Sequence, residues 1–279
     1  MRPDADELAG ASIRAWELLV RALPGAWACR AGGVLGVMTG VALAGFNGVR
    51  GEARAVDVSA VGRLLGAVRD AGVPYCLQLR AGWPSGIDDI ARAHGLVRVA
   101  GEPLMVLGDG SRLEEGSRLE EGSRLETGSR LGDFLHVDGL SVRRLEPEEA
   151  GLHARVAAGG QVVGREAPYR AVSSPGVLAT AGIRCYVGEV HGAPVTTAMS
   201  VTTGDYVGIF SVATLPEHRR RGYGAAVTAR AVGDAFEAGA QWAWLSASDA
   251  GYHVYESIGF VTIERLDFWE PRRRRAGGG

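Results

Sequence analysis

The sequence contains no lysine: all 30 basic residues are arginine, set against 32 acidic residues. Schiff-base chemistry and general-base catalysis by a lysine amine are therefore excluded. The net charge of −2 gives no overall attraction to nucleic acid or to an anionic membrane surface. We accordingly expect neither nucleic acid nor a membrane among the partners of this protein.

Cysteine and long apolar runs are also scarce. The three cysteines, Cys29, Cys76 and Cys185, are far apart and match neither a metal-binding spacing nor a disulfide framework. We expect no metal site. The most apolar stretch, residues 34–46, is too short and too rich in glycine to span a membrane. The first ten residues do not resemble a signal peptide, so we expect a cytoplasmic protein.

The most informative stretch is a strand, a basic turn and a helix in succession. Residues 206–212 are apolar and β-prone, a turn follows at Leu215-Pro216, and the helical pattern begins at Ala225. Between turn and helix lies Arg219-x-x-Gly222-x-Gly224. The first backbone N–H groups of a helix have no partner within it and face the positive end of its dipole. Glycines allow close approach of a ligand, so this stretch predicts an anion cradle.

This arrangement resembles the pyrophosphate-binding signature of the GCN5-related N-acetyltransferases (GNAT). A second motif follows in the order expected for that family, since a strand at residues 241–248 leads into Tyr255-Glu-Ser-Ile-Gly-Phe260. The resemblance covers residues 134–269, about half of the chain. It implies an α/β fold with a mixed sheet, the GNAT acyl-CoA N-acyltransferase fold, and a C-terminal catalytic lobe.

The resemblance also implies a reaction, the transfer of an acetyl group from acetyl-CoA to a primary amine of a small molecule or amino-acid-derived metabolite. Tyr255 matches the general acid that protonates the CoA thiolate, and Tyr252 is the alternative. A phenol with pKa of about 10 and a thiol of about 8.5 exchange a proton with little driving force. The implied cofactor-binding residues are Val212, Ala213 and Thr214 for the pantetheine arm, Arg219, Arg220, Arg221, Gly222, Tyr223, Gly224 and Ala225 for the pyrophosphate, and Ser248.

Two departures from the family pattern leave the mechanism open. Ser248 stands where many members have asparagine, and the strand at 206–212 lacks the glutamate that acts as base in many members. Glu166, Glu189 and Asp205 are the nearest acids in sequence, and none of them matches that position. An acceptor that enters as the neutral amine is one alternative. A non-catalytic acyl-CoA-binding regulatory protein is the other.

The domain organisation follows from the same patterns. We expect a degenerate GNAT-like or unrelated α/β domain at residues 1–108, a linker at 109–133, the GNAT domain at 134–271 and a disordered basic tail at 272–279. The linker repeats Gly-Ser-Arg-Leu-Glu-Glu from Gly110. Its glycines weaken a helix by roughly 1 kcal/mol each, which favours a flexible linker over a docking strip for a partner. We expect a monomer or homodimer.

Overall fold

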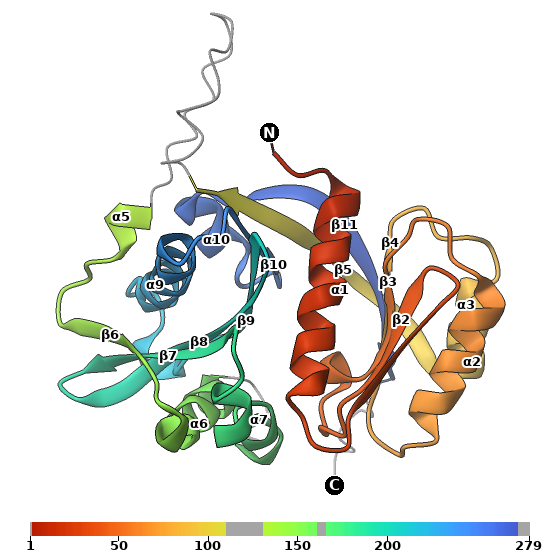
Figure 1. Cartoon of the computed structure of the whole chain (residues 1–279), viewed down its shortest axis with the longest axis horizontal. Helices are drawn as coiled ribbons and strands as arrows, with labels where there is room; N and C mark the ends of the chain where they lie inside the picture. The colour runs from red at the N-terminus through yellow and green to blue at the C-terminus, as the bar shows by residue number, and fades with distance from the viewer. Residues whose placement is uncertain (1, 110–130, 161–165, 273–279) are drawn as a thin grey trace, which may run out of the picture. The chain divides into compact units, whose positions relative to one another are not determined.

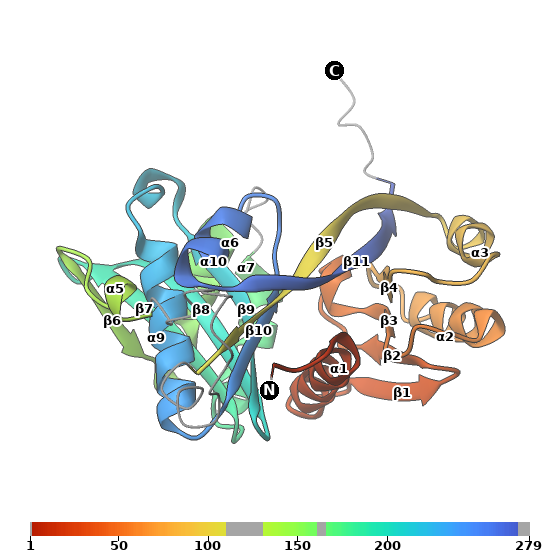
Figure 2. The same cartoon turned by 90° about the horizontal axis from the view of Figure 1, so that it is seen from above.

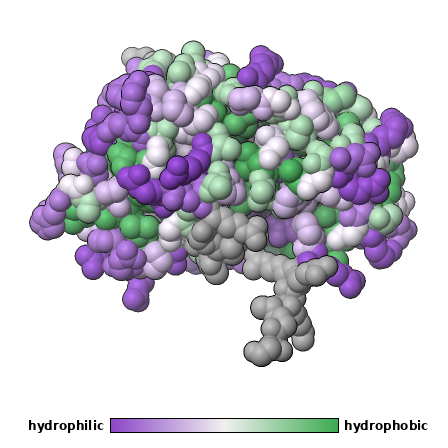
Figure 3. Space-filling model, turned by 90° about the horizontal axis from the view of Figure 1, so that it is seen from below, coloured by the Kyte–Doolittle hydropathy of each residue, from purple (hydrophilic) through white to green (hydrophobic). Residues whose placement is uncertain are grey.

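The computed structural model describes residues 2–109, 131–160 and 166–272, and the chain divides into two compact units (Figure 1). The C-terminal unit contains residues 104–263 with the first four residues of the chain, and the N-terminal unit contains residues 5–103 and 264–279. Most of the repeat and nearly all of the basic tail lie outside the described residues. In the described residues no helix is both long and apolar enough to cross a membrane, and no cluster of three potential metal ligands occurs. Hydrophilic side chains surround smaller apolar areas on the face in Figure 3.

The C-terminal unit is built on a mixed sheet. Strands β6, β7, β8 and β9 pair antiparallel in succession. Strand β9 then pairs with β10 in parallel, and β10 pairs antiparallel with the end of β5. In the order of pairing the strands are β6 (Leu140–Arg144), β7 (Ile183–Val190), β8 (Ala193–Thr203), β9 (Tyr206–Thr214), β10 (Trp242–Ser246) and β5 (Leu96–Gly108). The single parallel pair arises because a helix crosses over between β9 and β10.

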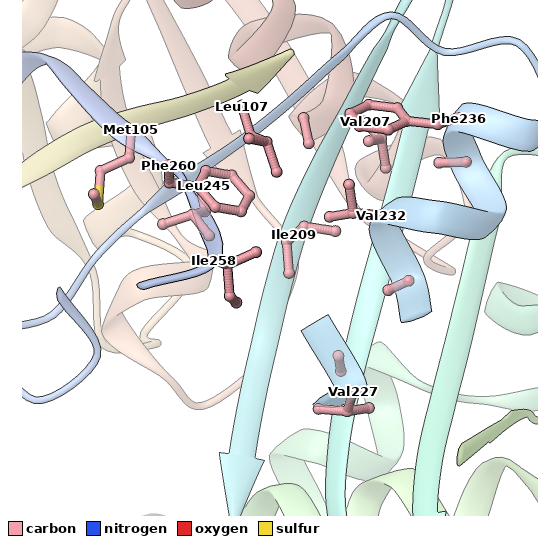
Figure 4. Close-up of a cluster of buried hydrophobic side chains, with 14 of the residues drawn as sticks. Met105, Leu107, Val207, Ile209, Val227, Val232, Phe236, Leu245, Ile258 and Phe260 are labelled. Atoms are coloured by element: carbon pink, nitrogen blue, oxygen red, sulfur yellow. The ribbon is translucent and has the colours of Figure 1, made fainter. Parts of the chain in front are cut away.

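That crossover helix, α9 (Tyr223–Glu237), covers one face of the sheet, and α6 and α7 cover the other (Figure 1). Val232 and Phe236 of α9 pack against Val207 and Ile209 of β9 in a buried core (Figure 4). The alternation of apolar residues along β9 thus serves both faces. The remaining helices are α5 (Leu131–Phe134), α6 (Ala150–Gly160), α7 (Glu166–Val172), α8 (Pro175–Leu178) and α10 (Tyr252–Ile258), with 3₁₀ turns η2 (Pro147–Glu149) and η3 (Pro216–His218).

The N-terminal unit has a smaller sheet of the same kind. Its strands pair in the order β1 (Trp27–Ala31), β2 (Val34–Met38), β3 (Gly48–Gly51), β4 (Cys76–Arg80) and β11 (Val261–Pro271), and β3 and β4 are parallel. Helices α1 (Ala5–Arg21) and α2 (Val58–Arg69) lie on opposite faces of this sheet (Figure 2). A core of α2, α3 (Ile87–Ala93) and β4 residues also includes the buried Trp269 of β11.

The two units repeat one order of elements and exchange their last strands. The run β3–α2–β4–α3–β5 corresponds to β9–α9–β10–α10–β11. Yet residues 104–108 of β5 pair with β10, and residues 266–269 of β11 pair with β4. The boundaries drawn from the sequence place these two segments in the opposite units, because strand partners are set by long-range pairing and not by local pattern. Those boundaries remain a proposal.

Strand β9 begins at Tyr206 as expected, and α9 begins at Tyr223, two residues before the expected start at Ala225. In the N-terminal unit a 3₁₀ turn η1 (Ala44–Phe46) precedes strand β3. A Cβ at Gly48 would lie 1.7 Å from the carbonyl oxygen of Cys76, so only glycine allows β3 and β4 to pair here. Asn47 is the turn residue: its side chain bonds the backbone of Thr39, Val41, Leu43 and Pro74.

Candidate functional site

Strands β9 and β10 separate after Gly208, the third residue of β9. Their parallel pairing runs from Tyr206–Trp242 to Gly208–Trp244 and ends there in the described residues. Residues 209–214 continue to pair with β8 along their other edge, as far as Thr214 opposite Thr196. Along its edge toward β10, β9 therefore has no β10 ladder partner beyond Gly208 in the described residues. Such an edge presents a row of backbone N–H and C=O groups to an extended ligand.

A β-bulge lies within this segment of β9. Phe210 is opposite Met199 and Ala213 is opposite Thr197, so β9 has one more residue than β8 between these pairs. Ser211 takes up the extra length with a φ of 52°, in the left-handed region. Bulges of this kind bend a strand and re-aim its backbone groups. The sequence carries no readable signal for it, because serine is ordinary in a strand.

The basic turn and the start of α9 have the backbone geometry that the predicted anion cradle requires. Arg220 and Gly222 adopt φ values of 60° and 80°, and α9 starts at Tyr223 without a side-chain cap. The first backbone bond of the helix joins Ala226 N to Gly222 O over 2.9 Å. The N–H groups of residues 223–225 therefore have no partner within the helix and lie at its positive end.

The three arginines of the turn have different surroundings. Arg219 donates to the carbonyl of Thr214 at 3.2 Å and to that of Gly160, at the end of α6, at 2.6 Å. Its side chain therefore ties the turn to its neighbours, and the side chains of Arg220 and Arg221 are exposed. Close packing supports this connection, since a Cβ at Gly160 would lie 2.8 Å from Cβ of Ala213. The cradle therefore depends on backbone geometry, with Arg220 and Arg221 adding positive charge.

Tyr255 lies half-buried on α10, which packs against α9. A Cβ at Gly251 would lie 2.8 Å from Cε2 of Tyr255, so the ring rests on the backbone of the preceding turn. Phe260 contacts the ring edge to face, with centroids 6.1 Å apart. Ser248 is exposed and accepts backbone bonds from Gly251 and Tyr252 at the start of α10. Tyr255 and Val212 both pack against the buried core of this unit.

Tyr252, the alternative acid, donates its hydroxyl hydrogen to Glu256 over 3.4 Å. The three acidic residues considered as catalytic bases either form ion pairs with arginines or lie at the far end of β9. Glu189 pairs with Arg143 at 3.2 Å, and Glu166 pairs with Arg170 at 2.8 Å. Asp205 precedes the first residue of β9, at the end opposite the cradle. Two of these three acids are thus held by arginines, and the third lies at the other end of β9 from Val212.

In the N-terminal unit the start of α2, which corresponds to the start of α9, is capped by a side chain. Asp57 caps α2, and its carboxylate accepts the backbone N–H of Ser59 at 2.8 Å. Hydrogen bonds from the Ser59 hydroxyl and N–H lower the pKa of Asp57. This negative charge occupies the helix end that Gly222 leaves open in the other unit. Strands β3 and β4 also stay paired as far as Arg50 and Gln78, next to the last residue of β3.

Comparison with known proteins agrees with the geometry of the C-terminal unit. Residues 181–262, from β7 to the start of β11, match the family model described as an acetyltransferase (GNAT) domain. This range includes the split strands, the cradle and Tyr255. A search of the curated proteins finds no significant match.

Solved structures resemble the chain over nearly its whole length. A GCN5-related N-acetyltransferase from Kribbella flavida is 21% identical, with a TM-score of 0.64 over 98% of this chain and 97% of that chain. One from Sphaerobacter thermophilus is 16% identical, with a TM-score of 0.53 over 98% and 95%. A tandem GNAT protein from the clavulanic acid biosynthesis pathway is 13% identical, with a TM-score of 0.51 over 97% of both chains. At these identities the likeness shows a shared tandem fold.

Proposed function

We propose that this chain, as a member of the GNAT family of acetyltransferases, transfers the acetyl group of acetyl-CoA to a primary amine of a small molecule. The observation that carries the proposal is the split between β9 and β10 beside an uncapped helix. The pairing of these strands ends at Gly208–Trp244, and the N–H groups of residues 223–225 face the anion cradle. One unit thus offers a strand edge that β10 leaves open for an amide-containing arm, and a positive helix end for a pyrophosphate.

The cofactor would lie along β9. The pyrophosphate would accept hydrogen bonds from the backbone N–H groups at the start of α9, with Arg220 and Arg221 supplying exposed positive charge. The pantetheine arm would lie along Val212, Ala213 and Thr214, on the edge of β9 that β10 leaves open. Thr196 fixes this segment from the other side, since its Oγ1 bonds Ala213 O and Thr214 Oγ1, both at 2.9 Å. The binding edge is therefore rigid before the ligand arrives.

The transfer itself needs one acid and a neutral amine. The amine nitrogen attacks the thioester carbon, the C–S bond breaks, and the CoA thiolate takes the hydroxyl proton of Tyr255. The proton lost by the acylated nitrogen returns to the Tyr255 phenolate through water, so the enzyme is restored. Gly251 and Phe260 hold the ring of Tyr255 in place for this step. No acid is carried by β9 itself, which is in line with an acceptor that enters as the free amine.

A non-catalytic acyl-CoA-binding protein is the second candidate. It is favoured by the ion pairs of Glu189 with Arg143 and of Glu166 with Arg170, which occupy two of the acids that could serve as base. Turnover discriminates between the two candidates, because both require the same cofactor site. The alternative would bind acetyl-CoA as tightly and release no thiol with any amine.

The decisive first test is a calorimetric titration of acetyl-CoA into the native chain and a Gly224→Glu variant. A Cβ at Gly224 meets only Thr214 Oγ1 at 3.5 Å, so the variant should fold, but its carboxylate would repel the pyrophosphate. Gly233→Glu is the matched control, because a Cβ at Gly233, on the same helix, meets nothing within 4 Å. We expect binding to the native chain and the control that Gly224→Glu abolishes. Failure of the native chain to bind would overturn the proposal.

A further inference from the structure

The last paired residues before the split are packed in an unusual way. A Cβ at Gly208 would lie 2.5 Å from Cζ2 and 2.8 Å from Cε2 of Trp244, and 2.8 Å from Cε2 of Phe210. The indole thus lies directly against the backbone of Gly208, and no other residue fits there. Phe210 meets the indole edge to face, with centroids 5.4 Å apart and planes at 82°. Two aromatic rings therefore lie together where β9 and β10 separate.

These rings lie on the sheet face opposite α9. Val207 and Ile209 point toward α9 and belong to its core, so Gly208 and Phe210, which alternate with them, point the other way. Trp244 is opposite Gly208 in the parallel register and shares that face. The rings therefore take no part in holding α9 to the sheet.

The indole nitrogen of Trp244 is a second, independent observation. Trp244 is only 3% exposed, and its Nε1 has no hydrogen-bond partner among the described residues. The ring atoms nearest Gly208 are Cε2, which is bonded to Nε1, and its neighbour Cζ2. The N–H edge of the indole therefore lies at the point of separation. A buried donor without an acceptor costs about 1–3 kcal/mol, which a ligand oxygen at that point would recover.

The distance from the cradle fits a thioester at this point. Residues 209–214 of β9 lie between Gly208 and the basic turn, and at about 3.3 Å per residue they span about 20 Å. An arm anchored by its pyrophosphate at the start of α9 and extended along this edge would bring its far end toward Gly208. The acyl group would then meet Trp244 and Phe210.

We propose that Trp244 and Phe210 form the end wall of the acyl site, so that the split accepts an acetyl group and excludes longer acyl chains. The Trp244 N–H faces the thioester carbonyl in this arrangement. The inference rests on the proposed function, because it assumes that the acyl-CoA arm lies along β9. It assigns a role to residues outside both sequence motifs, and it determines which donor the enzyme uses.

The test is a series of calorimetric titrations with CoA, acetyl-CoA, propionyl-CoA and butyryl-CoA. Each methylene in a closed apolar site changes discrimination by about 10-fold or more, so butyryl-CoA should bind the native chain at least about 10-fold more weakly than acetyl-CoA. Phe210→Ala should reduce this difference to about 3-fold or less and leave CoA affinity unchanged. Phe210→Leu, which retains more of the packing, should lie between the two. Trp244→Phe should also weaken the discrimination.

Trp242→Phe is the matched control, because Trp242 is on the same strand and face but two pairs further from the split, opposite Tyr206. It should leave the chain-length profile unchanged. Equal binding of all four ligands by the native chain would overturn the end wall while leaving the cofactor site intact. Failure of CoA itself to bind would instead overturn the proposed function.

Discussion

Arg80 Nε donates a hydrogen bond to Glu264 Oε2 over 2.8 Å, although 184 positions separate the two residues in the sequence. Arg80 ends β4 and Glu264 lies on β11, and their side chains are 1% and 5% exposed. Arg80 also pairs with Asp6 of α1 and donates to the carbonyl of Glu52. The buried guanidinium therefore fixes the last strand of the chain within the N-terminal unit.

Arg80→Met should destabilise the protein by about 3 kcal/mol, because the buried carboxylate of Glu264 then keeps only the half-exposed Arg54, 3.0 Å away, as its partner. Urea unfolding followed by circular dichroism measures the loss. Adding Glu264→Gln to this variant should recover part of it. Arg98→Met is the control: Arg98 pairs with Asp267 of the same strand at 2.7 Å but is half exposed, and its loss should cost at most about 1 kcal/mol. Equal losses from Arg80→Met and Arg98→Met would contradict this account.

The exchange that Arg80 helps to fix shows where sequence reasoning ends. Local periodicity locates β4, β5, β10 and β11 closely, because each strand is apolar on at least one face. The choice of partner depends on pairing between residues such as Leu266 and Arg80, which no local pattern contains. Sequence patterns thus predict elements of both units but assign two strand segments, residues 104–108 of β5 and 264–271 of β11, to the opposite unit.

The candidate site likewise has features that the sequence predicts and features that it does not. The spacing of Arg219, Gly222 and Gly224 predicts the cradle, because a glycine at the helix start has a direct physical reason. The left-handed Ser211 and the packing of Trp244 on Gly208 carry no such signal, since each depends on a neighbouring strand. The roles of the individual residues remain predictions until they are tested.

The closed helix end of the N-terminal unit predicts that each chain binds a single CoA. Asp57 already supplies the negative charge at the start of α2, and β3 and β4 do not separate as β9 and β10 do. Calorimetry should therefore give a stoichiometry of one. Asp57→Ala should lower the stability slightly through loss of the cap and leave the stoichiometry unchanged. Two CoA molecules per native chain would show that the second cradle is functional.

Tyr255→Phe should separate binding from catalysis. The ring keeps its place against Gly251 and Phe260, so acetyl-CoA affinity should change less than about 2-fold. Loss of the proton donor should lower kcat by about 100-fold or more, measured by thiol release with an active amine. Tyr252→Phe is the control, because the Tyr252 hydroxyl bonds Glu256, and it should retain kcat. If the outcomes of the two variants were reversed, Tyr252 would be the acid.

His153 should make the protein sensitive to mild acid. It is fully buried on α6, neither ring nitrogen has a partner in the described residues, and burial lowers its pKa to about 4. An unfolded chain, with a histidine pKa of about 6.5, binds this proton first, so its contribution to stability is complete above pH 6.5 and is lost as the pH falls toward 4. The native chain should lose about 2 kcal/mol more of its unfolding free energy than His153→Leu between pH 7.5 and 5, measured by urea unfolding.

The control is His253→Gln, which alters a residue with an 86% exposed side chain and should follow the native profile. Parallel profiles for the native chain and His153→Leu would show that His153 is charged in the folded protein or exposed to water.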